Sequence, residues 1–182
     1  KSLANSLSQN TASSPGLPPP LIVFDFDDTL SPTTWLSDMQ YEVPDKYALM
    51  LSLIGNLAAE VVTKAEKLAD VIILTNATPG WVEQCASTFM PSLWSVLKNL
   101  KIVSRPPHVN HMEFKVRRLA PLAVAYNNVI SIGDGEFERD AALNLLHPDR
   151  YVKSIKMFDN PTPADLYRQL LSVARRITDL MH

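Results

Sequence analysis

Short apolar runs alternate along this chain with longer segments in which apolar residues recur every three or four positions. The runs at 21–24 and 71–74 are apolar at every position and too short for helices, which is typical of parallel strands buried on both faces. Similar runs at 101–103, 129–132 and 151–157 predict three further strands.

The longest periodic segment starts at Pro44 and Asp45 and predicts a long amphipathic helix. Its apolar stripe consists of Met50, Ile54, Leu57, Val61, Ala65 and Leu68. Shorter helices are predicted over 81–89, 93–97, 114–126, 137–146 and 164–180. Strands that alternate with helices predict an α/β fold of three layers, a Rossmann-like parallel sheet covered by helices on both faces. In such sheets, ligands bind beyond the carboxyl ends of the strands.

Composition supports one folded domain preceded by a polar arm. The chain has 182 residues, of which 46% are hydrophobic, enough for a single core. Residues 1–19 are rich in Ser, Asn and Gln and end in prolines, so we expect a flexible proline-rich arm there and a domain over 20–182.

Charge and cysteine content narrow the function classes. A net charge of -2 argues against a protein that mainly binds nucleic acid or anionic membrane. No run approaches the roughly 18 consecutive apolar residues of a membrane span, so none is expected. The single cysteine, Cys85, excludes an intramolecular disulfide and is compatible with a reducing, intracellular compartment. We expect Cys85 to be an inert core thiol.

Acidic and hydroxyl side chains follow three of the predicted strands. The first strand runs into Asp25-Phe26-Asp27-Asp28-Thr29, the second ends in Thr75-Asn76, and the fourth ends in Gly133-Asp134-Gly135. Clustered acids repel one another and need a cation. Oxygen ligands without Cys or His spacing favour a hard ion such as Mg²⁺ over zinc.

These residues resemble the motifs of the haloacid dehalogenase (HAD) superfamily of phosphohydrolases, over nearly the whole chain from residue 20. The first motif, a hydrophobic strand followed by Asp-x-Asp-x-Thr, corresponds to 23–30. The second, an apolar strand that ends in Thr, corresponds to 72–75, and the fourth to 130–134. The third motif is a single lysine, for which Lys115 is the best-placed candidate.

The resemblance implies a role for each matching residue. Asp25 would be the nucleophile that forms an aspartyl-phosphate, and Asp27 would act first as general acid and then as general base. Thr75 and Lys115 would contact phosphoryl oxygens. Thr29 would hold the turn that orients the two acids and border the phosphate.

Further implied roles concern donors and metal ligands. Asn76 would add a donor to the phosphate. The carboxylates of Asp25 and Asp134, with the backbone carbonyl of Asp27, would bind Mg²⁺. Family members often carry an Asp four residues after the Asp of the fourth motif. Here that position is Glu138, which we expect to act through a water or to support another ligand.

The spacing between motifs leaves no room for a lid domain. About 40 residues separate Leu30 from Val71, and the long helix occupies roughly half of them. The site should therefore be open and capless, with a short flap over 31–43 that contains Trp35 and Tyr41. Of the tryptophans, we expect only Trp35 to lie near substrate.

These observations favour a Mg²⁺-dependent phosphomonoester hydrolase with an open site suited to a large phosphorylated substrate such as a phosphoprotein. A small-metabolite phosphatase whose site is covered by an oligomer partner is an alternative. Two others are a non-catalytic binding or scaffolding protein on the same fold, and a phosphotransferase.

Overall fold

The computed structural model describes residues 19–181. The arm expected over residues 1–19 therefore lies outside the described residues, except for Pro19.

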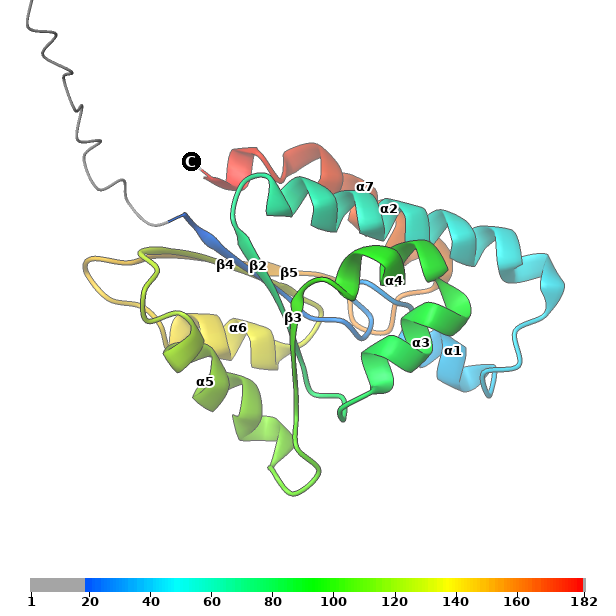
Figure 1. Cartoon of the computed structure of the whole chain (residues 1–182), viewed down its shortest axis with the longest axis horizontal. Coiled ribbons are helices and arrows are strands. Elements are labelled where there is room, and N and C mark those ends of the chain that lie inside the picture. The colour runs from blue at the N-terminus through cyan, green and yellow to red at the C-terminus, as the bar shows by residue number, and fades with distance from the viewer. Residues whose placement is uncertain (1–18, 182) are drawn as a thin grey trace, which may run out of the picture.

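A sheet of five strands, all parallel, forms the centre of the molecule in the order β3-β2-β1-β4-β5 (Figure 1). The strands are β1 (Leu21–Phe24), β2 (Asp70–Thr75), β3 (Lys101–Ser104), β4 (Asn128–Gly133) and β5 (Tyr151–Lys156). The predicted α/β, Rossmann-like parallel sheet is confirmed, because each predicted strand is present.

Helices cover the sheet on both faces and make three layers (Figure 1). One face carries α2 (Ala48–Glu66), α3 (Trp81–Phe89), α4 (Pro91–Leu97) and α7 (Pro163–Arg176). The other face carries α5 (His111–Leu122) and α6 (Glu136–Leu143). Three short elements complete the fold: α1 (Thr33–Asp38) and the 3₁₀ turns Asp45–Tyr47 and Asp179–Met181.

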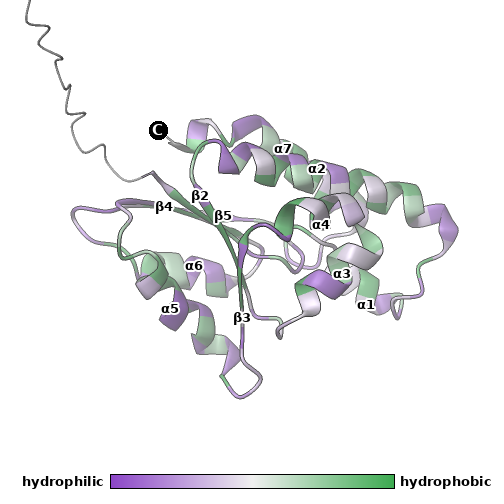
Figure 2. Cartoon of the chain, in the orientation of Figure 1, coloured by the Kyte–Doolittle hydropathy of each residue, from purple (hydrophilic) through white to green (hydrophobic). Residues whose placement is uncertain are grey.

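The apolar strands divide their side chains between two cores. In β1, Ile22 and Phe24 join the core beneath α2, whereas Leu21 and Val23 join the core beneath α5 and α6. This alternation explains why β1 is apolar at every position. The helices carry both hydrophobic and hydrophilic residues along one ribbon, as expected for elements that cover a sheet (Figure 2).

The structure differs from the sequence expectation at several element ends. The flap expected over 31–43 contains a helix, α1, which the pattern did not predict. Helix α5 starts at His111, earlier than expected, because the side chain of Asn110 accepts a hydrogen bond from the Met112 amide at 2.8 Å and caps the helix. Helix α4 starts at Pro91, a residue suited to the first helical position.

By length and composition alone, the helical stretch Asp45–Glu66 is apolar enough to cross a membrane. Polar residues such as Asn56 and Glu60 interrupt this stretch, so it contains no run of about 18 consecutive apolar residues, and the expectation of no membrane span stays a prediction. In the fold, this stretch includes α2, which buries Ile54, Ala58 and Val61 in the core of a compact α/β domain. Partial burial of this kind is weakly consistent with a soluble protein.

Candidate active site

The acids that follow β1 and β4 meet where the strand order of the sheet reverses. From β1, the chain passes to β2 and β3 on one side and returns to β4 and β5 on the other. Such a switch point leaves a crevice at the carboxyl ends of the two central strands. Asp25 follows β1, and its amide donates to the Ile132 carbonyl at 2.9 Å, while Asp134 follows β4. The topology therefore brings the first and fourth motifs together.

Three carboxylates gather in this crevice around one lysine. Oxygens of Asp25, Asp134 and Glu138 all lie within 4.8 Å of one another. Lys115 reaches them from α5: its Nζ lies 2.8 Å from Asp25 Oδ1 and forms an ion pair with Glu138 Oε1. One ammonium against three carboxylates leaves two negative charges uncompensated, which is the charge that a divalent cation would balance.

The pKa values of these groups show the effect of crowding and burial. Burial raises the pKa of Asp25 well above its usual range; the Lys115 ammonium opposes this, while Glu138 and Asp27 add to it. The pKa of Asp134 rises to about 6, mainly through burial and secondly through the Glu138 carboxylate. Burial would lower the pKa of Lys115, but Asp25 and Glu138 outweigh it and raise that pKa.

One side-chain oxygen of Glu138 bears on whether a metal ion fits this cluster. Its Oε2 is buried and has no hydrogen-bond partner among residues 19–181. A buried carboxylate oxygen without a donor lowers the stability of the fold. Because no donor occupies this oxygen, it is available to bind a metal ion. Asp25, Asp134 and Glu138 offer only oxygen atoms, a set that fits a hard cation such as Mg²⁺.

Glu138 belongs to the carboxylate cluster itself. Its expected action through a water or in support of another ligand stays a prediction. Helix α6 begins directly after β4, so Glu138 turns back over the end of that strand. Gly133 provides the room: a Cβ there would lie 2.3 Å from Glu138 Cγ. The one extra methylene of Glu relative to Asp is accommodated by this missing side chain.

Thr29 orients Asp134. Its side chain is fully buried, and its hydroxyl donates to Asp134 Oδ1 at 3.2 Å while it accepts from the Asp134 amide at 3.1 Å. The structure thus places Thr29 against Asp134, where it links the loop after β1 to the loop after β4.

Asp27 is half-buried and lies outside the three-carboxylate cluster. Thr75 Oγ1 donates to its Oδ2 at 3.1 Å, and the indole nitrogen of Trp81 donates to its Oδ1 at 2.9 Å. The Thr75 hydroxyl also accepts from the Ala77 amide at 2.9 Å. Both oxygens of Asp27 are therefore held, and they are held by a different set of residues from those around Asp25.

Asn76 and a second lysine border the site. The Asn76 Oδ1 atom is buried without a hydrogen-bond partner in the described part of the chain, and the Asn76 carbonyl accepts from Arg105 Nε at 2.9 Å. Arg105 therefore holds the loop after β2. Lys156, at the end of β5, donates to the backbone carbonyl of Asp134.

Two further residues near these acids have no assigned role in the sequence-based expectations. Trp81 was expected only to fill space, yet it binds Asp27; conversely, Trp35 lies edge-to-face against Tyr47, with ring centres 5.0 Å apart. Asp28, which had no assigned role, accepts from the Thr34 amide at 2.9 Å and ties α1 to the loop after β1. A carboxylate just before a Thr-Thr helix start was the only signal for this contact.

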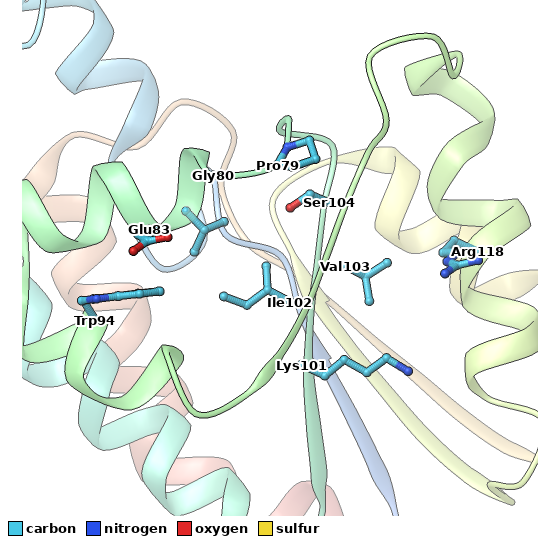
Figure 3. Close-up of a pocket in the computed structure, with 10 residues that line it drawn as sticks. Pro79, Gly80, Glu83, Trp94, Lys101, Ile102, Val103, Ser104 and Arg118 are labelled. Atoms are coloured by element: carbon cyan, nitrogen blue, oxygen red, sulfur yellow. The ribbon is translucent and has the colours of Figure 1, made fainter.

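Two cavities of similar size lie at this end of the sheet, and only one borders the acids. A cavity of about 450 Å³ has Asp27 in its wall, together with residues of α1, the loop after β2, and Trp81. A cavity of about 480 Å³ runs along the outer edge of β3, between Trp94 on one side and Arg118 on the other (Figure 3). Because the second contains none of the candidate site residues, the first is the relevant one.

Comparison of the chain with protein-family models, with curated proteins and with solved structures found no match. Sequence and structure together establish a five-stranded parallel α/β fold with a buried Asp/Asp/Glu group that could hold a metal ion.

Proposed function

We propose that this protein is a Mg²⁺-dependent phosphomonoester hydrolase that works through Asp25, as the resemblance to the HAD superfamily implies. The observation that carries the proposal is the separation of two acids on one loop. Asp25 lies in the oxygen-only cluster beside Lys115, whereas Asp27, two residues later, borders an open cavity. Nucleophile and proton donor need these two different surroundings.

In the first half of the reaction, a carboxylate oxygen of Asp25 attacks phosphorus. The new Asp25–phosphorus bond forms as the ester bond to the leaving oxygen breaks, and that oxygen takes a proton from the Asp27 carboxyl. In the second half, a water attacks phosphorus and gives its proton to the Asp27 carboxylate. The bond to Asp25 breaks, inorganic phosphate leaves, and both acids return to their starting states.

The surrounding residues orient the nucleophile and the phosphate. Lys115, 2.8 Å from Asp25 Oδ1, holds the nucleophile and, with two of its three protons directed to Asp25 and Glu138, offers the third to a phosphoryl oxygen. Thr75, the last residue of β2, donates to Asp27, and Asn76 follows it with a buried side-chain oxygen that has no hydrogen-bond partner in the described part of the chain. Asp25, Asp134 and Glu138 would hold Mg²⁺, which when bound screens the negative nucleophile from the negative phosphate.

A binding or scaffolding protein on this fold accounts less well for the cluster. Burying three carboxylates around one ammonium is unfavourable for folding, and a scaffold has no use for the excess charge. A phosphotransferase would use the same Asp25 chemistry with an alcohol in place of water, and product analysis in the presence of competing alcohols separates the two.

Hydrolysis of 4-nitrophenyl phosphate tests the proposal. We expect turnover that requires Mg²⁺, is lost in EDTA, and falls by about a thousandfold or more in Asp25→Asn. Asp140→Asn, an exposed acid of α6, is the matched control and should keep wild-type activity. Absence of turnover over a broad panel of phosphomonoesters with Mg²⁺ present would refute the proposal.

A further inference from the structure

The cavity of about 450 Å³ beside Asp27, here named the Asp27 pocket, lies where a leaving group has to be. Asp27 forms part of its wall. In the proposed reaction, Asp27 gives its proton to the oxygen that leaves phosphorus, so the carbon skeleton attached to that oxygen extends on the Asp27 side. The volume lies within the usual range for small-molecule sites.

The walls of the Asp27 pocket are fixed before any ligand binds. Asp28 anchors α1 through the Thr34 amide, and Trp81 is fixed by its bond to Asp27. Tyr41 stands edge-to-face against Trp81, with ring centres 5.6 Å apart.

Tyr41 reaches this position through an uncommon backbone conformation. Its φ is +61°, and that of the preceding Gln40 is +53°. Two consecutive residues other than glycine in the left-handed region carry a conformational cost, and a bulky Tyr is rare there. A hydrogen bond of 2.9 Å from the Tyr41 amide to the Leu36 carbonyl holds the turn. This turn places the Tyr41 ring in the lining of the pocket.

The lining of the Asp27 pocket is uncharged except for Asp27 itself. Of the residues that the structure describes, no Lys, Arg or His lines it. As Asp27 gives its proton to the leaving oxygen it becomes a carboxylate, so a leaving group with its own carboxylate or second phosphate would meet that developing negative charge without any cation in the lining to balance it. The cavity along β3 shows the contrast, because Lys101 and Arg118 line it (Figure 3).

Hydroxyl groups and two aromatic rings make up most of the remaining lining: Thr33, Thr34, Ser37, Thr78, Tyr41 and Trp81. The Thr33 and Thr34 hydroxyls already donate to the Ser31 carbonyl and to Asp28, so they can accept from the hydroxyls of a substrate. Ring faces match the C–H surface of a substrate.

We propose that the Asp27 pocket binds the leaving group of the substrate and selects monophosphate esters of uncharged, hydroxyl-bearing alcohols, such as polyols and sugars. This inference rests on the proposed phosphatase function and deepens it. It favours a small, neutral substrate over a phosphoprotein segment rich in acidic residues.

Two substrates of matched size test the charge preference. Glycerol 3-phosphate and 3-phosphoglycerate share a three-carbon skeleton and differ in one end group, a neutral CH₂OH or a carboxylate. We expect the wild type to hydrolyse glycerol 3-phosphate with a kcat/KM about tenfold or more above that for 3-phosphoglycerate.

A positive charge added to the pocket wall tests whether the uncharged lining causes this substrate preference. Ser37 is an exposed residue of α1, and Ser37→Lys places a cation beside the leaving group. We expect this variant to reduce the preference by about fivefold or more, through a higher kcat/KM for 3-phosphoglycerate. Ser95→Lys, the same change on an exposed position of α4 that does not line the pocket, should leave the ratio unchanged.

The outcomes separate this inference from the function on which it rests. Equal rates for the two substrates, together with no response to Ser37→Lys, would overturn the pocket assignment while hydrolysis of 4-nitrophenyl phosphate still supports the phosphatase. Absence of hydrolysis of 4-nitrophenyl phosphate and of every other phosphomonoester in the panel would overturn the proposed function. A preference that changes equally in Ser37→Lys and Ser95→Lys would mean that net charge, and not the pocket, decides, which also overturns the inference.

Discussion

The indole N–H of Trp81 donates a hydrogen bond to Asp27 Oδ1 at 2.9 Å, between residues that are 54 positions apart in the chain. Trp81 is the first residue of α3, and the preceding Gly80 has a φ of +90°, which a glycine adopts without strain. With Thr75 on the other oxygen, this bond fixes the plane of the Asp27 carboxylate. Trp81 is therefore a positioning residue for the proposed proton donor.

Replacing Trp81 by Phe removes the donor and keeps an aromatic ring. Asp27 should then lose its orientation, which matters most when the leaving group is a poor one. We expect kcat for an alkyl phosphate to fall by about tenfold to a hundredfold, because alkoxide departure needs the proton. With 4-nitrophenyl phosphate, whose phenolate leaves unprotonated, kcat should change by less than about threefold.

Trp94→Phe is the matched control, since Trp94 borders the cavity along β3 and not the Asp27 pocket. It should affect both substrates little. Equal losses for alkyl and aryl phosphates in Trp81→Phe would show that Trp81 supports the fold alone and does not position the acid.

Gly133 controls whether Glu138 reaches the cluster. A Cβ at position 133 would lie 2.3 Å from Glu138 Cγ, so Gly133→Ala has to push Glu138 away from Asp25 and Asp134. We expect the Mg²⁺ concentration for half-maximal activity to rise about tenfold or more, and overpacking to lower the free energy of unfolding by about 1 to 3 kcal/mol. Titration of activity with Mg²⁺ and urea unfolding measure the two effects.

Gly55→Ala provides the comparison. A Cβ at Gly55 would lie 2.9 Å from Met90 Cβ, at the contact of α2 with α4. This variant should lose stability by overpacking and keep the wild-type Mg²⁺ dependence. If both variants shift the Mg²⁺ dependence equally, the change reflects general loosening and Glu138 is not a ligand.

The fold and the first acids of the site could be read from the sequence because their signals are local. A run such as Leu21–Phe24 specifies a buried strand, and Asp25 follows it directly. The rule that ligands bind at the carboxyl ends of parallel strands then brings Asp134 to the same place. No long-range contact had to be known for either step.

The contacts that complete the site depend on tertiary packing, which the pattern does not contain. Trp81 reads as an ordinary helix residue until the loop after β2 places it over Asp27. The place of Glu138 in the carboxylate cluster depends on the space that Gly133 leaves beside it. This space is seen only in the folded structure. The contact of Asp28 with the Thr34 amide, which anchors α1, likewise appears only once the loop after β1 is folded.

Lys115 neutralises two buried carboxylates at once, so its removal should lower the free energy of unfolding. It is 2% exposed and contacts both Asp25 and Glu138. In EDTA, Lys115→Met should lower the free energy of unfolding by about 3 to 5 kcal/mol, because it leaves buried charges without a partner. Adding Glu138→Gln removes one of those charges and should restore part of the loss, as measured by urea unfolding.

Lys98→Met, at an exposed position after α4, is the control for removing a lysine. It should change the free energy of unfolding by less than about 0.5 kcal/mol. A loss below about 1 kcal/mol in Lys115→Met would contradict the view that the lysine neutralises the cluster.

The thiol of Cys85 provides a pH-dependent test of the packing beneath the Asp27 loop. Its Sγ lies 3.5 Å from Ser31 Oγ; burial raises its pKa to about 11, with a smaller contribution from the Asp27 carboxylate. Only the thiolate reacts with iodoacetamide, so alkylation of the folded protein should keep rising about tenfold per pH unit from 8 to beyond 10. In urea the same thiol should level off near its ordinary pKa of 9.0. If the alkylation rate of the folded protein also levelled near pH 9, the fold would not keep the Cys85 thiol neutral. Asp27 would then have a second anion, the Cys85 thiolate, in its surroundings.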